Sequence, residues 1–154
     1  MKVQLIKNEA MDKEWINSHK ELLNYGNTLK GHPITIHFSN IIEGILEITK
    51  GDIKTITFKN IPDAEFNERK NQLAQDIPGF IKTSTYLGWT ETVSGKHPEA
   101  ACFVYFHKID KKDFILCLRK MKSNHHYKPY AIISKEKLLI DLEGRIIHKE
   151  KPDQ

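Results

Sequence analysis

The spacing of hydrophobic and polar positions changes along this 154-residue chain. Apolar residues recur at intervals near 3.6 over residues 9–25, which predicts an amphipathic helix. Residues 33–38 and 53–59 alternate between apolar and polar side chains, which predicts two short strands. Residues 40–49 and 62–75 combine helix-start signals with apolar positions at helical spacing, so each predicts a further helix.

The second half of the chain has a different texture, because strand-like runs separated by turn signals follow Gly79. This pattern predicts an antiparallel meander, followed by a last helix over residues 134–142. We therefore expect an α+β fold, with N-terminal helices and short strands packed on a curled antiparallel sheet formed mainly by residues 80–148. We expect a single domain over residues 1–150 and a frayed tail over residues 151–154.

The central hairpin of this meander allows a more detailed prediction. If Asp110 to Asp113 form its loop, Ile109 pairs with Phe114 across the two strands. Both faces of the hairpin are largely apolar near its middle, so it should be a central hairpin that is covered on at least part of both sides. Cys102 and Cys117 lie in these apolar runs, which predicts two buried thiols without a disulfide.

The composition is that of a globular protein, with 39% hydrophobic and 29% charged residues. No apolar run approaches the roughly 20 residues needed to span a bilayer, so no membrane association is expected. The first residues contain too short an apolar stretch for a signal peptide, which predicts a cytoplasmic location.

Positive charge is concentrated in the second half of the chain. Residues 1–80 contain 10 basic and 11 acidic residues, whereas residues 81–154 contain 14 basic and 9 acidic ones. Residues 104–128 alone hold seven basic residues against two acidic ones. Such a field favours RNA or another polyanion as the partner, although a merely solvated basic surface is an alternative.

The densest set of candidate functional residues lies within residues 119–128. Histidine has an ordinary pKa near 6.5 and suits general acid–base catalysis, while arginine and lysine can stabilise a charged phosphorane. Neither a metal nor a cofactor is required, because the 2′-hydroxyl nucleophile belongs to RNA. The candidate catalytic residues are His125, His126, Arg119 and Lys120. The candidate substrate-binding residues are Tyr127 as a base-stacking ring, Lys128, Lys122, Lys82 and His97. An exposed hairpin loop with incidental basic residues is the alternative.

Residues 101–134, ACFVYFHKIDKKDFILCLRKMKSNHHYKPYAIIS, form a basic hairpin followed by a basic loop and a further strand. With helices before it, this arrangement resembles the small toxin ribonucleases of the barnase, EndoU, colicin-nuclease and RelE group. The resemblance is architectural and covers about a quarter of the chain. It implies a curled antiparallel sheet whose strands and loops carry residues that act on RNA.

Two kinds of function are consistent with these features. The first is a metal-independent endoribonuclease, toxin-like or phage-associated, that cleaves RNA by 2′-hydroxyl attack with histidine as general acid or base. A small acidic inhibitor protein would be a natural partner of such an enzyme. The second is a binding module without catalysis, either a nucleic-acid binder or a small protein inhibitor. An enzyme that acts on another anionic substrate, such as a nucleotide, is a third possibility.

Overall fold

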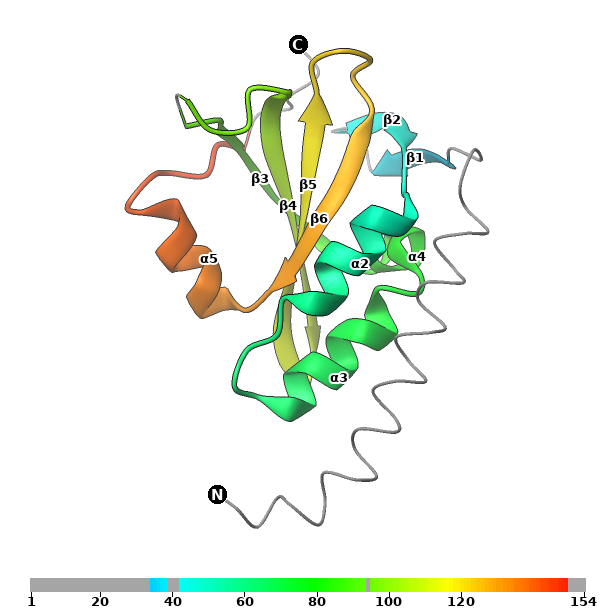
Figure 1. Cartoon of the computed structure of the whole chain (residues 1–154), viewed down its shortest axis with the longest axis vertical. Coiled ribbons are helices and arrows are strands. Elements are labelled where there is room, and N and C mark those ends of the chain that lie inside the picture. The colour runs from blue at the N-terminus through cyan, green and yellow to red at the C-terminus, as the bar shows by residue number, and fades with distance from the viewer. Residues whose placement is uncertain (1–33, 39–41, 94, 150–154) are drawn as a thin grey trace.

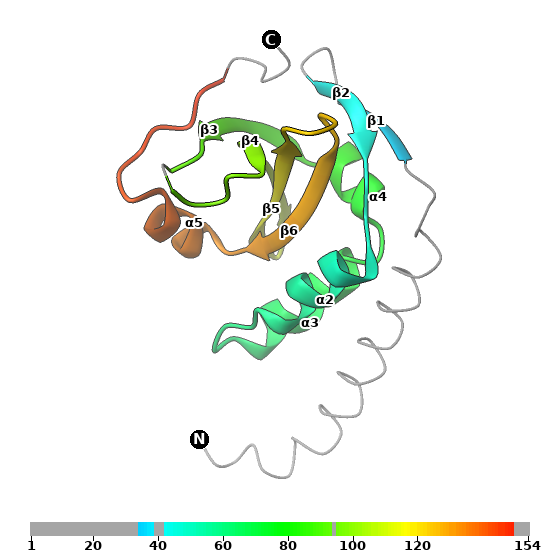
Figure 2. The ribbon, with the colours of Figure 1, turned by 45° about the horizontal axis from the view of Figure 1, so that its top comes forward.

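The computed structural model describes residues 34–38, 42–93 and 95–149, which form a curled six-stranded sheet with helices against both faces (Figures 1 and 2). The elements are β1 (Ile34–Phe38), β2 (Ile42–Leu46), α2 (Lys50–Phe58), α3 (Ala64–Leu73), α4 (Ile77–Lys82), β3 (Thr85–Glu91), β4 (Ala100–Asp110), β5 (Lys112–Met121), β6 (Tyr127–Ile133) and α5 (Lys135–Leu142). This architecture confirms the predicted α+β class. The predicted helix over residues 9–25 lies outside the described residues.

The sheet has the strand order β1-β2-β6-β5-β4-β3. Strands β3 to β6 form the predicted antiparallel meander, with β4 and β5 paired along most of their lengths. The pair β2–β6 is parallel and meets only where Leu46 faces Tyr127. The Glu47 N–H adds one hydrogen bond to the Tyr127 carbonyl at 2.9 Å. The sheet is therefore mixed, with a short β1–β2 ribbon attached at one end of β6 (Figure 1).

Two predicted elements near the start of the described region are wrong. The predicted helix over residues 40–49 contains the strand β2, and the predicted strand over residues 53–59 lies largely in the helix α2. Helix α2 begins with a capping box, in which the Thr49 hydroxyl accepts from the Asp52 N–H and the Asp52 carboxylate accepts from the Thr49 N–H. Ile53 and Ile56 are then buried at helical spacing.

A third difference lies just before β3, where the run of residues 80–87 was expected to be extended. Residues Ile77–Lys82 form the short helix α4, and β3 begins only at Thr85. Asp76 caps α4 by accepting a hydrogen bond from the Gly79 N–H at 3.0 Å, and a proline occupies the first turn. The other predicted helices, over residues 62–75 and 134–142, are confirmed as α3 and α5.

The register of the central hairpin is shifted by one residue from the prediction. Ile109 faces Asp113, and Lys108 faces Phe114. The turn is shorter than expected because Lys111 alone links the paired Asp110 and Lys112, with a left-handed φ of 67°. Side chains still alternate between the two sheet faces within each strand. However, each residue of β4 pairs with the β5 residue one position away from its predicted partner.

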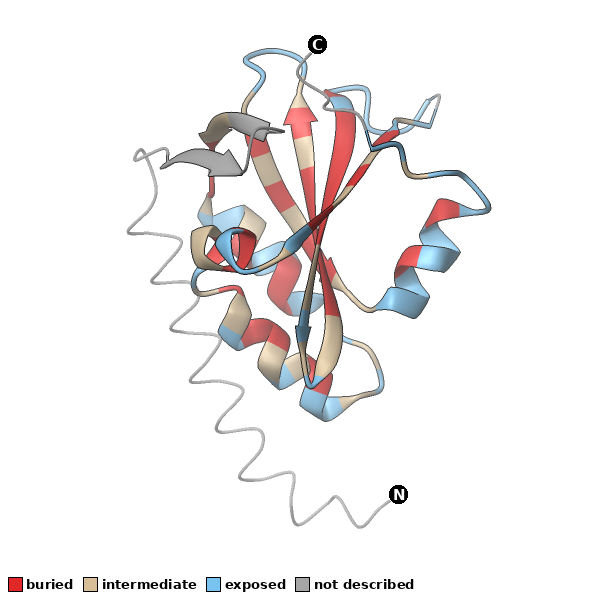
Figure 3. Ribbon diagram, turned by 180° about the vertical axis from the view of Figure 1, so that it is seen from behind, coloured by how far each residue is buried: buried red, intermediate tan, exposed pale blue. Residues whose placement is uncertain are grey.

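Apolar side chains cover both faces of the hairpin, as predicted, and form two core clusters. Figure 3 shows the buried positions along the central strands in red. The larger cluster lies on the face covered by α2, α3 and α4, and it includes Phe106, Phe114 and Leu116. The smaller cluster includes Tyr105 and Cys117 and packs against α5. Cys102 and Cys117 are both buried and form no disulfide with one another, as predicted. No helix in the described part of the chain is long and apolar enough to cross a membrane.

The segment after α5 returns to the edge strand β3. The backbone of His148 exchanges two hydrogen bonds of 2.8 Å with that of Trp89. Gly88 makes this approach possible, because a Cβ at this position would lie 2.1 Å from the His148 carbonyl oxygen. Gly88 also has a φ of 134°, which side-chain-bearing residues rarely adopt. This closing segment therefore lies beside α5 and the smaller core cluster.

Candidate anion-binding pocket

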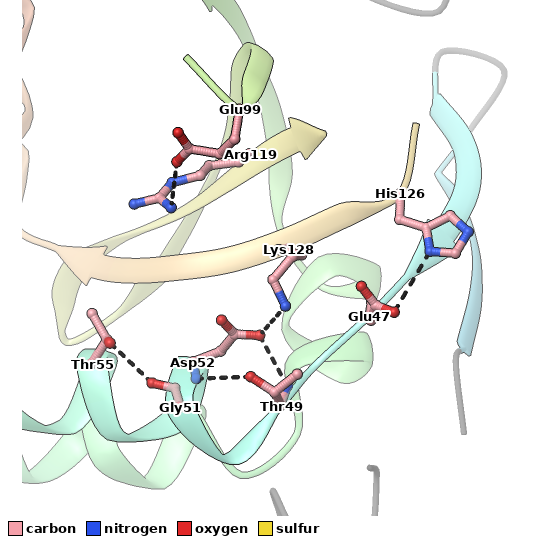
Figure 4. Close-up of polar contacts among 9 residues, drawn as sticks. All are labelled: Glu47, Thr49, Gly51, Asp52, Thr55, Glu99, Arg119, His126 and Lys128. Carbon is pink, nitrogen blue, oxygen red and sulfur yellow. Dashed lines mark hydrogen bonds and ion pairs between the residues drawn. The ribbon is translucent and has the colours of Figure 1, made fainter. Parts of the chain in front are cut away.

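The residues predicted from the 119–128 segment do not form a single site. Figure 4 shows separate ion pairs that involve three of them. Arg119 Nη1 lies 3.3 Å from Glu99 Oε2, and Lys128 Nζ lies 2.9 Å from an Asp52 oxygen on α2. His126 lies apart from both, with Nδ1 3.8 Å from a carboxylate oxygen of Glu47 just after β2. Adjacent residues diverge because successive side chains of a strand point to opposite faces.

Lys120 and Tyr127 belong to the protein core rather than to an open surface. Tyr127 is 1% exposed within the larger core cluster, and Lys120 is 8% exposed with its ammonium 5.9 Å from the Tyr127 ring centroid. A ring so deeply buried has no free face for a nucleotide base. The predicted stacking role of Tyr127 is therefore incompatible with its position, and the same burial removes Lys120 from direct contact with substrate.

Three other predicted site residues, Lys122, His125 and Lys82, are exposed and lie at two separate places on the surface. Lys122 and His125 occupy the β5–β6 turn, where the His125 N–H donates to the Met121 carbonyl at 3.0 Å. Lys82 lies at the C-terminal end of α4. The basic residues at the β4–β5 turn lie at the other end of the hairpin, which spans about 30 Å at roughly 3.3 Å per residue. The charge of residues 104–128 therefore divides between two ends of the sheet.

A pocket of about 610 Å³ brings Arg119 and His97 together between α5 and the smaller core cluster. Both residues were predicted from the sequence, and both line this pocket. The other basic lining residues are Lys59, Lys96 and Arg145. They are opposed in the lining by only two carboxylates, those of Asp141 and Glu143. The pocket therefore carries an excess of positive charge.

Glu99 links the two predicted residues at the rim of this pocket. Its Oε2 atom lies 3.3 Å from Arg119 Nη1 and 3.8 Å from His97 Nδ1. The His97 ring meets the edge of Phe103, with 5.6 Å between ring centroids. Residues 97 and 99 flank Pro98 in the loop before β4, so the loop presents both side chains beside Arg119. A histidine, a carboxylate and a guanidinium thus lie next to one another.

The floor of the pocket is aromatic and electrically neutral. Burial raises the pKa of the Tyr130 hydroxyl far above its usual value, and the neighbouring Cys117 and Tyr105 act in the same direction. Burial also raises the pKa of Tyr105, and it raises the pKa of the Cys117 thiol to about 12. All three groups are therefore protonated at neutral pH, so the floor adds no negative charge to offset the basic side chains.

Arg145 anchors the wall formed by α5. Its guanidinium donates to the carbonyls of Asp141 and Leu142 at the end of this helix, and to the Glu91 carbonyl at the end of β3. Carbonyl acceptors leave the guanidinium charge uncompensated. Arg145 therefore stabilises the helix terminus and adds a fixed positive charge to the pocket.

Lys59 reaches the pocket from the loop after α2, and a buried lysine fixes that loop. Lys70 on α3 is fully buried, and its ammonium donates to the Lys59 carbonyl at 2.7 Å and to Asn60 Oδ1 at 2.9 Å. Burial and, to a smaller extent, the charge of Lys59 lower the pKa of Lys70 to about 8. The Lys70 ammonium, whose burial is unfavourable in free energy, therefore holds the backbone from which Lys59 extends.

This burial predicts a pH dependence of stability. Between about pH 8 and pH 10.5, the unfolded chain keeps a proton on Lys70 that the folded protein has lost, so the free energy of unfolding should rise with pH. Lys70→Met should remove on the order of 1–3 kcal/mol of this rise, because methionine does not titrate. Urea unfolding of both proteins across this pH range measures the difference. If the free energies of unfolding of the two proteins changed in parallel with pH, burial would not lower the pKa of the Lys70 ammonium.

A second hollow lies between α3 and the β4–β5 turn, but its charges are paired. Arg69 forms an ion pair with Asp110, and the hydrogen bond from Arg69 lowers the pKa of that carboxyl group. Lys112 lies 3.2 Å from Asp63, which caps α3. Such internal pairing leaves little net field for a ligand, so the pocket beside α5 is the better candidate.

Sequence reasoning missed Lys59, Tyr130 and Arg145. They lie on three different elements and meet only because α2 packs beside β6 and the chain after α5 returns to β3. Glu99 was also missed, although its position two residues after His97 is a local signal. His107 on β4 has a local partner, because its Nε2 lies 2.7 Å from Asp113 Oδ1.

Comparisons with protein-family models, curated proteins and solved structures found no significant match to this chain. The resemblance to small toxin ribonucleases therefore stays a prediction. In the described residues, no group of three or more histidine, cysteine, aspartate or glutamate side chains is placed to hold a metal ion.

Proposed function

We propose that this protein binds single-stranded RNA through its phosphate groups at the pocket beside α5. The observation that carries the proposal is the gathering of basic side chains from separate elements around one pocket. Four permanent cations and His97 line it, against two lining carboxylates and Glu99 at the rim. Its volume of about 610 Å³ lies within the range of about 300–1,000 Å³ typical of ligand sites.

The pocket favours the recognition of phosphate over the recognition of bases. Phe103 and Tyr105 are 7% and 5% exposed, so neither offers a ring face wide enough for stacking. The Tyr130 ring is already in contact with the cationic groups of Lys59 and Arg119. Phosphate contacts carry no direct sequence information. We therefore expect binding with little sequence preference and with a strong dependence on salt.

A matched pair of double variants tests this proposal. Lys59→Met/Lys96→Met removes two pocket cations, and we expect it to weaken the binding of a single-stranded RNA oligonucleotide about tenfold, which corresponds to about 1.4 kcal/mol. Lys54→Met/Lys135→Met removes two exposed lysines that do not line the pocket, and it should change the affinity much less. Fluorescence anisotropy at constant salt measures both. Equal losses in the two variants would mean that binding is not located at the pocket.

RNA cleavage at the same pocket is a second candidate function, supported by the contact of Glu99 with both His97 and Arg119. In this reaction His97 accepts the 2′-hydroxyl proton, the 2′ oxygen attacks phosphorus and the bond to the 5′ oxygen breaks. The products are a 2′,3′-cyclic phosphate and a 5′-hydroxyl, whose oxygen takes a proton from water, and His97 then returns its proton to the solvent. Glu99 would orient the imidazole, and Arg119 would stabilise the negative charge of the phosphorane.

A further inference from the structure

We propose that Lys59 and Arg119, held against the ring of Tyr130, form the phosphate subsite of the pocket. The Arg119 guanidinium carbon lies 4.8 Å from the centroid of this ring, and the Lys59 ammonium lies 5.7 Å from it. The inference rests on the proposed function, since it names the part of the same pocket that takes the phosphate. The ligand class is a phosphate or pyrophosphate group, either free or within a nucleotide chain.

The electrostatics of this arrangement favour a bound anion. Two like charges converge on one neutral ring, and Glu99 is the carboxylate that pairs with Arg119. Lys59 makes no ion pair with any residue in the described part of the chain. Arg119 carries five N–H donors, of which Glu99 accepts one at 3.3 Å. An anion that contacts both cations would reduce their repulsion and use donors that the protein leaves available, such as Arg119 Nε.

The groups that support the subsite are packed or hydrogen-bonded. The Tyr130 hydroxyl interacts with Cys117 and Tyr105 below it, and the edge of the ring meets Phe103 at 5.5 Å between centroids. The backbone of Lys59 is fixed by the hydrogen bond from the buried Lys70. A ligand would therefore meet cations whose supports are already ordered, which lowers the entropic cost of binding.

The ring has a specific part in this subsite, because a cation over an aromatic face is attracted to the ring quadrupole. Tyr130 thus contacts two cations without neutralising either of them. An aliphatic side chain of similar size would lose this attraction, whereas phenylalanine would keep it. Comparison of Tyr130→Leu with Tyr130→Phe therefore separates the electrostatic role of the ring from the role of its hydroxyl.

Binding of pyrophosphate, measured by isothermal titration calorimetry on the full chain, tests the subsite. We expect the single variants Lys59→Met and Arg119→Met each to weaken pyrophosphate binding about tenfold or more, and Tyr130→Leu to weaken it similarly. Tyr130→Phe, which keeps the ring but not the hydroxyl, should weaken binding less than Tyr130→Leu, and the control Lys54→Met should stay within about threefold of the unmodified protein. Circular dichroism checks that each variant is folded.

The outcomes of this experiment distinguish the subsite from the proposed RNA-binding function. Pyrophosphate binding that is absent from the folded protein, or that is unaffected by both Lys59→Met and Arg119→Met, overturns the subsite. Loss of pyrophosphate binding in these variants, in a protein that fails to bind RNA, supports the subsite and refutes the proposed function. If a variant does not fold, ¹⁵N NMR of the unmodified protein replaces it. The Arg119 Nε resonance should then move during the titration, and a fixed resonance would contradict the subsite.

Discussion

Tyr127→Ala is expected to lower the free energy of unfolding by about 3–5 kcal/mol, the usual range for truncating a fully buried aromatic side chain. Tyr127 is 1% exposed at the point where β2 meets β6, and its ring lies against Gly44. A Cβ at Gly44 would lie 2.7 Å from the Tyr127 Cε2 atom, so the ring fills the space that this glycine leaves. Truncation would open a cavity there and loosen the junction of the two strands. Urea unfolding at neutral pH measures the loss.

Tyr127→Phe is the matched control for this prediction. It keeps the ring and its packing, so it should cost much less than the alanine variant. The opposite result for Tyr127→Ala would support the base-stacking role that the sequence predicted for Tyr127. If Tyr127→Ala left stability within about 1 kcal/mol and reduced RNA affinity, Tyr127 would have to be a surface ring that contacts nucleotides.

His97→Asn is expected to lower the rate of RNA cleavage by about 10²–10⁴-fold if cleavage occurs at the pocket, because that is the usual contribution of a general acid or base. Asparagine retains a polar side chain, but its amide is not basic enough to accept the 2′-hydroxyl proton. Cleavage by the unmodified protein should persist in EDTA, because the nucleophile comes from the substrate. Denaturing gel electrophoresis of a defined RNA after timed incubation measures the rate.

The double variant His125→Asn/His126→Asn is the control, since both residues lie outside the pocket. It should cleave RNA at nearly the rate of the unmodified protein. Loss of cleavage in this control, with normal cleavage by His97→Asn, would place the catalytic residues in the β5–β6 turn after all. RNA that stays intact with the unmodified protein would exclude catalysis and leave the binding function.

The fold of the second half could be predicted because its strand-like runs are separated by strong local turn signals. The segment from residue 40 to residue 59 could not, because its isoleucine and threonine residues fit both a strand and one face of a helix. Thr49 and Asp52 were the deciding signal, since their spacing forms the capping box that begins α2. In the hairpin, Lys111 alone, with a left-handed φ, replaces the predicted loop from Asp110 to Asp113, and the pairing of the two strands shifts by one residue along their whole length.

The candidate site could be predicted only in part, because it is assembled by topology. Arg119 and His97 were identified from their chemistry and lie together in the pocket. Arg119 and Lys120 are neighbours in the sequence, but the strand directs them to opposite faces of the sheet. Lys59 and Tyr130 are far apart in the sequence, and they meet because α2 packs beside β6. Neither residue type nor spacing in a single sequence indicates such a contact.

The most direct test of the account is the salt dependence of RNA binding. Each phosphate contact in a single strand contributes about −0.7 to the slope of log K against log salt concentration. Lys59→Met/Lys96→Met should therefore reduce the magnitude of the slope by about 1.4, whereas Lys54→Met/Lys135→Met should leave it nearly unchanged. Slopes that are equal in the unmodified protein and in the pocket variant would contradict the claim that this pocket holds the phosphates of RNA.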